Sequence, residues 1–195
     1  MKRITGIVLL LALALTVVAC GEPAATPTPL PTATPIPSPT PLPTTPYSNA
    51  SVGLSATLPG SDWMAPRPVP SDTGNNFAGE VVVNTAKTLF FVPSRTANNP
   101  NLPDDQELGV YVSTYKTGFL SGPATQSNET FHGYPAVRLE GVAVGNQIAG
   151  DGHYVIYVFF AGRNVFVIIA GSSVPTWDKG GQAQVQAIFD SIVLK

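Results

Sequence analysis

The sequence contains little cysteine and little histidine, and these shortages argue against a disulfide-stabilised fold and against a zinc site. Its 195 residues include one cysteine, Cys20, so no disulfide can form within the chain and the fold must rest on an apolar core. The two histidines, His132 and His153, lack the His-x-x-x-His or Cys-x-x-Cys spacing of a zinc site. We therefore expect structural or incidental histidines, with no metal ion and no cofactor.

Charge is also scarce, and no block of one sign stands out. The chain has ten lysines and arginines and 12 aspartates and glutamates, which gives a formal net charge of −2. Nucleic-acid binding normally needs a basic stripe that neutralises phosphates, so we expect no nucleic-acid partner. The densest acidic group is Asp104, Asp105 and Glu107. It lacks the register of a calcium-binding EF-hand loop, and the start of a helix explains the same residues.

The short motifs of common enzyme sites are absent from the sequence. Ala170-Gly171-Ser172-Ser173 falls short of the Gly-x-Ser-x-Gly turn that presents a nucleophilic serine. The glycines have neither phosphate-loop nor dinucleotide-binding spacing. We predict that the protein is not an enzyme. An envelope hydrolase stays as an alternative, because two catalytic carboxylates need be close only in space.

The N-terminus has the layout of an export signal. Met1-Lys2-Arg3 is basic, and Ile4–Val18 is an apolar stretch too short to span a membrane comfortably. Val17-Val18-Ala19-Cys20 then resembles the lipobox of bacterial lipoproteins. The resemblance implies a signal peptide at 1–19, cleavage before Cys20, and lipid on Cys20. An ordinary signal peptide or an uncleaved anchor is the alternative.

A proline-rich linker follows the leader. Half of the 20 prolines lie in Glu22–Pro46, where they alternate mostly with Thr and Ala. Proline lacks a backbone donor and has a fixed φ, so this stretch predicts a disordered stalk of polyproline II type. At about 3.1 Å per residue the stalk could reach on the order of 70–80 Å. We assign 20–46 to the lipidated N-terminus and linker, and 47–195 to one globular domain.

The most apolar part of the domain lies near its C-terminus. His153–Phe160 and Val165–Ala170 are rich in β-branched and aromatic residues, and a short turn with Gly162 and Asn164 separates them. Both faces of both stretches are apolar, which predicts a central hairpin covered on both sides. The run Gln182–Ile192 has apolar residues at helical spacing, and this helix most simply covers the sheet.

Other strands are predicted from alternation and turn residues. The opening stretch Tyr47–Pro59 alternates with a period of two and predicts one strand. Proline, asparagine and glycine predict loops at Met64–Asn76, Pro93–Pro103 and Gly145–Gly152. Further strands are expected at Glu80–Val83, Thr88–Val92, Ser127–Phe131, Ala136–Val144 and Ser191–Leu194.

Asp104–Phe119 carries two competing signals. Asp104 and Glu107 fit a capping box, and the apolar and aromatic residues that follow fall on one helical face. Gly109 and the Val-Tyr-Val composition favour a strand instead. We predict a helix and keep the strand as the alternative.

The order of landmarks resembles the PsbP-like family. Tyr47, Val52-Gly53-Leu54 and Trp63 match the opening of that family, and His132–Ala136 resembles its Gly-x-Pro-Ala turn. Tyr157–Ala170, Trp177 and Ile188–Ile192 resemble its closing hairpin, tryptophan and helix end. Bacterial lipoproteins of LpqN type are similar in layout. The resemblance implies an α+β fold, with a central antiparallel sheet flanked by helices on both faces, but it implies no common activity.

Four aromatic residues are candidates for a ligand cleft, although core packing explains such residues equally well: Trp63, Tyr111, Tyr115 and Trp177. We predict a non-catalytic, lipid-anchored binding protein on the extracytoplasmic face of the cell membrane or envelope. Its expected role is that of an accessory or adaptor subunit with a protein partner. The alternative is a module that binds a small apolar or sugar ligand.

Overall fold

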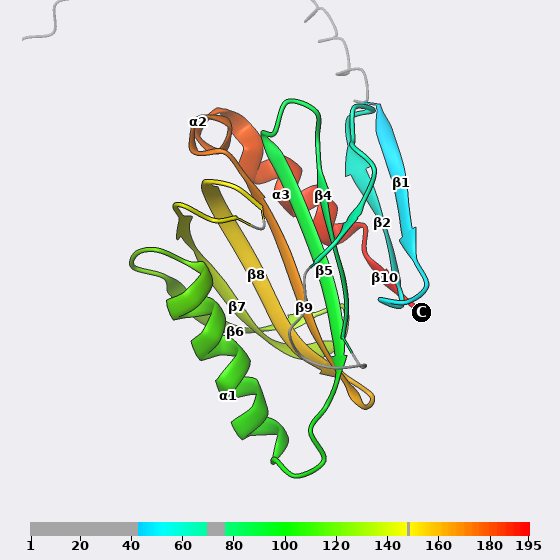
Figure 1. Ribbon diagram of the computed structural model, residues 1–195, viewed down its shortest axis with the longest axis vertical. Helices are drawn as coiled ribbons and strands as arrows, with labels where there is room; N and C mark the ends of the chain where they lie inside the picture. The colour runs from blue at the N-terminus through cyan, green and yellow to red at the C-terminus, as the bar shows by residue number, and fades with distance from the viewer. Residues whose placement is uncertain (1–42, 70–76, 148) are drawn as a thin grey trace, which may run out of the picture. The chain divides into compact units, whose positions relative to one another are not determined.

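A seven-stranded antiparallel sheet forms the centre of the computed structural model, which describes residues 43–69, 77–147 and 149–195 (Figure 1). Cys20 and most of the predicted stalk lie outside these residues. The spatial order is β3-β4-β5-β9-β8-β7-β6. The strands are β3 (Arg67–Pro68), β4 (Phe77–Val83), β5 (Leu89–Ala97), β6 (Thr125–Phe131), β7 (Tyr134–Ala143), β8 (Gly152–Ala161) and β9 (Asn164–Ser172).

The predicted central hairpin is confirmed. β8 and β9 pair along their whole length, and each also pairs with a neighbour, β7 or β5. Nearly all of their residues are buried because both faces of the sheet are covered. Gly162 turns the chain between the two strands with a φ of 62°, a conformation that glycine adopts without strain.

The prediction of a loop at Pro93–Pro103 is wrong for its first five residues, which belong to a strand. β5 continues through Pro93 to Ala97, and Pro93 pairs in register with Ile168 of β9. On the other side, the ladder with β4 is interrupted between the pairs Gly79–Ser94 and Val82–Phe91. Proline has no N–H to donate, so a gap in one ladder lets it lie inside the sheet.

The opening stretch forms a hairpin and not the single predicted strand. β1 (Thr44–Asn49) pairs with β2 (Leu54–Pro59), and β10 (Val193–Leu194) adds a third strand to this smaller sheet. The Asn49 side chain accepts a hydrogen bond from the Val52 N–H (2.9 Å), and Gly53 has a φ of 80°. β1 begins at Thr44, three residues before the domain boundary that we placed at Tyr47.

The helix predicted at Asp104–Phe119 is confirmed, but its capping box is wrong. Helix α1 spans Asp104–Thr114 and continues as the π-helical turn η1 (Tyr115–Phe119). Pro103 is the N-cap residue, and no side chain caps the helix. Glu107 instead folds back onto the preceding loop, where both carboxylate oxygens accept the Asn99 N–H at 3.1 and 2.9 Å.

The C-terminal helical region also follows the prediction. It contains α2 (Val174–Thr176), the π-helical turn η2 (Trp177–Gly181) and α3 (Gln182–Asp190). Val185, Ile188 and Phe189 of α3, with Ile192 just beyond it, are at most 3% exposed. None of the helices in the described ranges is long and apolar enough to cross a membrane.

Two apolar layers lie on opposite faces of the large sheet. One contains α3 residues, the inner face of β2 and Phe91, Tyr157 and Phe159 of the sheet. The other contains Val112 and Phe119 of the α1 region with Phe90, Tyr154 and Ile156. The central antiparallel sheet with helices on both faces confirms the predicted α+β fold class (Figure 1).

Candidate functional site

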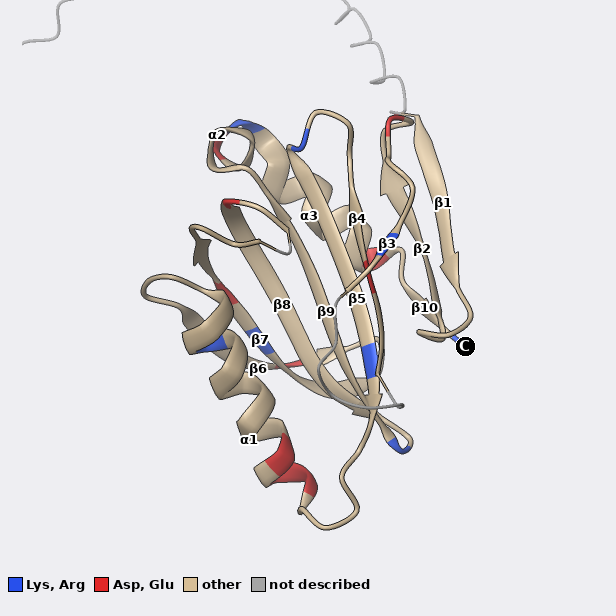
Figure 2. Cartoon of the chain, viewed as in Figure 1, with Lys and Arg blue, Asp and Glu red and all other residues tan. Residues whose placement is uncertain are grey.

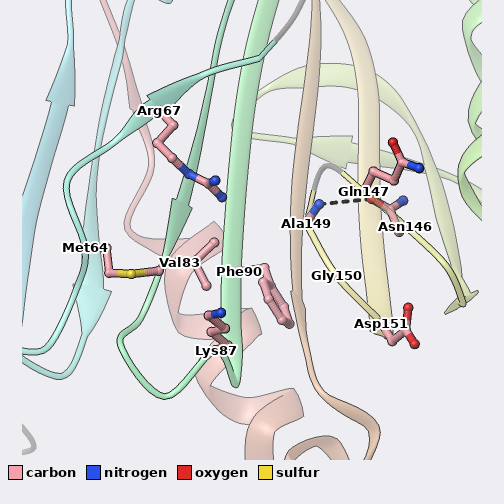
Figure 3. Close-up of a pocket in the computed structure, with 10 residues that line it drawn as sticks. All are labelled: Met64, Arg67, Val83, Lys87, Phe90, Asn146, Gln147, Ala149, Gly150 and Asp151. Carbon is pink, nitrogen blue, oxygen red and sulfur yellow. Dashed lines mark hydrogen bonds between the residues drawn. The ribbon is translucent and has the colours of Figure 1, made fainter.

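A pocket of about 400 Å³ lies on the α1 face of the sheet, at the end of β5 (Figure 3). Three segments that are distant in the sequence form it. The first segment, with Met64 and Arg67, runs beside β4. The second is the end of β4 with the turn into β5, and the third is the loop before β8. The lining residues are Met64, Arg67, Val83, Lys87, Phe90, Asn146, Gln147, Ala149, Gly150 and Asp151.

Backbone hydrogen bonds hold the first segment against β4. The Met64 N–H donates to the Val83 carbonyl (2.9 Å), and Arg67 pairs in register with Val81. The Val69 N–H donates to the Gly79 carbonyl (2.9 Å). These bonds form a short added edge of the sheet and so bring the Met64 and Arg67 side chains to the pocket.

A buried asparagine organises the turn that carries Lys87. The Asn84 side-chain oxygen accepts the N–H groups of Thr88 (2.7 Å) and Leu89 (3.0 Å). The Asn84 carbonyl accepts the Lys87 N–H (2.9 Å). Lys87 thereby takes a φ of 55°, in the left-handed region that glycine usually occupies and that strains other residues.

The loop before β8 is ordered by its own side chains. Asp151 accepts the Gly145 N–H (2.6 Å), and Asn146 accepts the Ala149 N–H (3.0 Å). The Tyr154 hydroxyl donates to the Gly150 carbonyl (2.7 Å). Burial, with a contribution from the Asp151 charge, raises the pKa of Tyr154, so the hydroxyl stays protonated and keeps this bond.

The pocket combines an apolar floor with a charged rim. Val83, Phe90 and Ala149 are buried, whereas Arg67, Lys87 and Asp151 are exposed. Figure 3 shows the two cationic side chains on one side and the loop with Asp151 on the other. An apolar floor with a few convergent polar groups is the arrangement of small-ligand sites.

A second pocket, of about 520 Å³, adjoins the first. It is lined by Thr114, Tyr115, Gly118, Phe119, Gly145, Asn146 and Gln147. Asn146 and Gln147 belong to both pockets, so the loop before β8 separates them. Burial raises the pKa of the Tyr115 hydroxyl, which therefore stays neutral at physiological pH.

The structure does not bring the four predicted cleft aromatics together. Tyr111 and Tyr115 pack on the α1 face, whereas Trp63 and Trp177 pack against the layer that contains α3. The Trp63 indole N–H donates to the Pro59 carbonyl (2.8 Å), and Trp177 stacks on His153 with ring centres 3.9 Å apart. Spacing along the sequence could not reveal this separation, because it depends on which side of the sheet each loop crosses.

Both histidines have identifiable contacts. His132 has a φ of 48° in the turn between β6 and β7, and its Nε2 lies 2.8 Å from the Phe189 carbonyl. His153 Nε2 lies 2.9 Å from Glu140, which also pairs with Arg138 at 2.5 Å. Across the residues placed by the structure, no three His, Cys, Asp or Glu side chains gather as a metal site would require.

The pocket residues were missed by the sequence analysis. Arg67, Gln147 and Asp151 lie within stretches predicted as loops, and Lys87 lies in the predicted strand connection. No motif links these residues, because the pairing of β3 with β4, β4 with β5, β5 with β9 and β9 with β8 brings them together. The one local signal was the Asn84-Thr85-Ala86-Lys87 turn itself, whose asparagine is typical of a turn that forms side-chain hydrogen bonds.

The architecture is the PsbP-like α+β fold that the sequence landmarks predicted. The chain is similar to cyanobacterial PsbP (CyanoP) from Synechocystis sp. PCC 6803, with 12% identity and a TM-score of 0.53 over 78% of this chain and 92% of that one. It is also similar to LpqN, involved in cell envelope biogenesis of Mycobacterium tuberculosis, with 14% identity and a TM-score of 0.46 over 78% of this chain and 86% of that one.

Neither a protein-family profile nor a curated protein sequence matches the chain. At 12% identity, the likeness to CyanoP shows the fold alone and does not identify a function.

Proposed function

We propose that this protein is a non-catalytic, extracytoplasmic binding protein that is held at the membrane by lipid on Cys20. It binds a small ligand in the pocket between β3, the β4–β5 turn and the loop before β8. The single observation that carries the proposal is the pocket itself. Its floor is apolar and buried, and its polar groups converge from three separate segments. Such a site can bind and orient a molecule.

The chemistry of the lining favours binding over catalysis. General acid–base work needs a titratable group that is free to accept or donate a proton within hydrogen-bond reach of the substrate. Asp151 is the one acid among the described residues of the lining, and its Oδ1 accepts the Gly145 N–H. Arg67 and Lys87 bring positively charged hydrogen-bond donors, which suit the binding of an anionic group.

An accessory or adaptor role is the second candidate, and the β6 edge of the large sheet favours it. β6 pairs with β7 on one side, and six of its seven residues are exposed. No backbone hydrogen bond to its outer edge exists among the residues that the structure describes. An extended segment of a partner protein could add to such an edge as another strand.

The exposed apolar residues do not by themselves support an adaptor surface. The exposed large apolar residues within the described ranges lie in α1, α2, β10 and two separate loops: Val110, Val174, Val193, Leu102 and Val144. Single exposed apolar residues are normal on soluble domains, whereas docking surfaces are contiguous.

Native mass spectrometry of the full chain, purified gently from its own membranes, tests the pocket proposal. We expect a bound small molecule that is lost from a Gln147→Trp variant, because Gln147 is exposed and lies at the edge of both pockets. Gln186→Trp, on the exposed face of α3, is the matched control and should keep the molecule.

Either of two results would contradict the proposal. One is a bound molecule that persists in Gln147→Trp, which would place it elsewhere. The other is native protein without any bound molecule, which would leave the accessory role as the better candidate.

A further inference from the structure

We propose that the ligand of this pocket is a monoanion, a carboxylate or phosphodiester group attached to an apolar body, with Arg67 and Lys87 as its binding residues. The inference rests on the proposed function and names the chemical class of the ligand. It follows from the partners of the two cations, from the charge balance of the lining and from the backbone of Lys87.

Arg67 and Lys87 line the pocket and have no internal acceptor for their side chains; Arg95, Arg163 and Lys179 likewise have none among the described residues, but they are not in the pocket lining. Arg138 pairs with Glu140, Lys116 donates to Gln126, and Lys195 donates to Ser48. Arg67 and Lys87 make neither an ion pair nor a hydrogen bond through their side chains with any residue in the described ranges. Their donors are therefore available to a ligand in the pocket that both line.

The charges of the described lining residues sum to one positive charge. Arg67 and Lys87 contribute two positive charges, and Asp151 contributes one negative charge from the opposite side of the pocket (Figure 3). Figure 2 shows blue on β3 and on the turn between β4 and β5, and red on the loop before β8. A single negative charge placed near the two cations would balance this set and lie away from Asp151.

The floor beneath the cations is apolar. Val83 and Phe90 are at most 5% exposed, and Met64 is half-buried beside them. A ligand that consisted only of an anion would leave this floor in contact with water. An apolar body attached to the anion would cover the floor and remove it from water, which favours binding.

Backbone strain at Lys87 gives independent support. A φ of 55° favours glycine, and a lysine at that position costs stability. The Asn84 hydrogen bonds hold the backbone of this turn, but the Lys87 side chain gains no partner in it among the described residues. Glycine would fit this backbone without strain, whereas the lysine places a cation on the rim of the pocket.

The experiment uses the full chain labelled with ¹³C on its methionine methyl groups and placed in nanodiscs of neutral phosphatidylcholine. The chain has two methionines, Met1 and Met64, and Met64 lines the pocket, so its methyl resonance reports occupancy directly. Benzoate is the anionic probe, and benzamide is a neutral probe of nearly the same shape. We expect benzoate to shift the Met64 resonance with a Kd at least about ten-fold below that of benzamide.

Variants locate the interaction. Arg67→Gln and Lys87→Gly should each raise the Kd for benzoate about ten-fold, which corresponds to the loss of one charge-assisted hydrogen bond. Lys87→Gly also relieves the strained φ, so a failure to fold does not explain its loss of binding. Arg163→Gln, in the turn between β8 and β9 and outside the pocket lining, is the control and should bind benzoate like the native protein.

A second arm separates the sources of the anion. If a lipid headgroup is the ligand, nanodiscs of phosphatidylglycerol will shift the Met64 resonance without benzoate, and Lys87→Gly will abolish that shift. If the ligand is soluble, only benzoate will do so. Both results support the monoanion class.

Equal affinities for benzoate and benzamide would overturn the monoanion assignment while leaving a pocket that binds small molecules. No shift with either probe, or unchanged benzoate binding in both pocket variants, would overturn the assignment as well. The proposed function is judged separately, by the loss of the native bound molecule in Gln147→Trp.

Discussion

At the scale of single residues, the pocket depends on a few side chains that order the backbone. Asn84 holds the β4–β5 turn through two backbone N–H groups, and Asp151 and Asn146 close the loop before β8. Each is a polar residue whose hydrogen bonds replace those that a regular strand would form. The side chains that face the ligand are therefore presented by turns that a rigid sheet supports.

The left-handed backbone of Lys87 leads to a stability prediction. Lys87→Gly should raise the free energy of unfolding by about 1 kcal/mol, because glycine adopts a φ of 55° without a steric penalty. Urea unfolding of the full chain, followed by pulse proteolysis, measures the change. Lys87→Ala removes the same charge but keeps the strained Cβ, so it serves as the control and should not stabilise. A destabilised Lys87→Gly protein would show that the lysine side chain itself supports the fold.

At the scale of elements, the two main helices cover the sheet unequally. The inner residues of α3 are almost fully buried between the two sheets, and Val185 is 1% exposed. Helix α1 has a weaker apolar face, and Val110 on its outer side is 58% exposed. α1 is also attached by the Glu107 carboxylate, which accepts the Asn99 N–H of the preceding loop.

The same substitution in the two helices tests this difference. Val185→Ala should lower the free energy of unfolding by about 2 kcal/mol, through lost apolar contact and the cavity left behind. Val110→Ala should change it by less than about 0.5 kcal/mol, because little area is lost and alanine favours helices. Urea midpoints of the full-length variants give both values. Similar losses from the two variants would mean that α1 is docked more firmly than its exposure indicates.

At the scale of the whole molecule, the lipid anchor is a prediction from Ala19-Cys20-Gly21 and the leader before it. Cys20→Ser removes the sulfur that would carry the lipid, so we expect release from the membrane fraction or retention of the uncleaved leader. Membrane fractionation and the mass of the N-terminal peptide measure both. Ser38→Ala, within the predicted stalk, is a control that should leave anchoring unchanged. Normal processing and full membrane retention of Cys20→Ser would contradict the lipoprotein assignment.

Much of the architecture could be predicted from local pattern. The doubly apolar β8–β9 hairpin, the face of α3 and the helix at 104–119 were all visible as periodic runs, because side-chain period follows directly from backbone geometry. The secondary-structure predictions were wrong where the same residue pattern is compatible with two different structures. Pro93 indicated a loop but lies inside β5, since a gap in the β4 ladder accommodates its missing N–H. The opening alternation concealed a hairpin turn at Ala50–Gly53.

Local pattern was enough to predict the β8–β9 hairpin, the two main helices, the apolar centre and the PsbP-like order of landmarks, because each depends on neighbours along the chain. Only the tertiary structure placed Trp63 and Trp177 on the opposite face from Tyr111 and Tyr115, and it joined Arg67, Lys87 and Asp151 around one pocket. These groupings depend on strand order and on the side of the sheet that each connection crosses, and neither is encoded in the spacing of the residues.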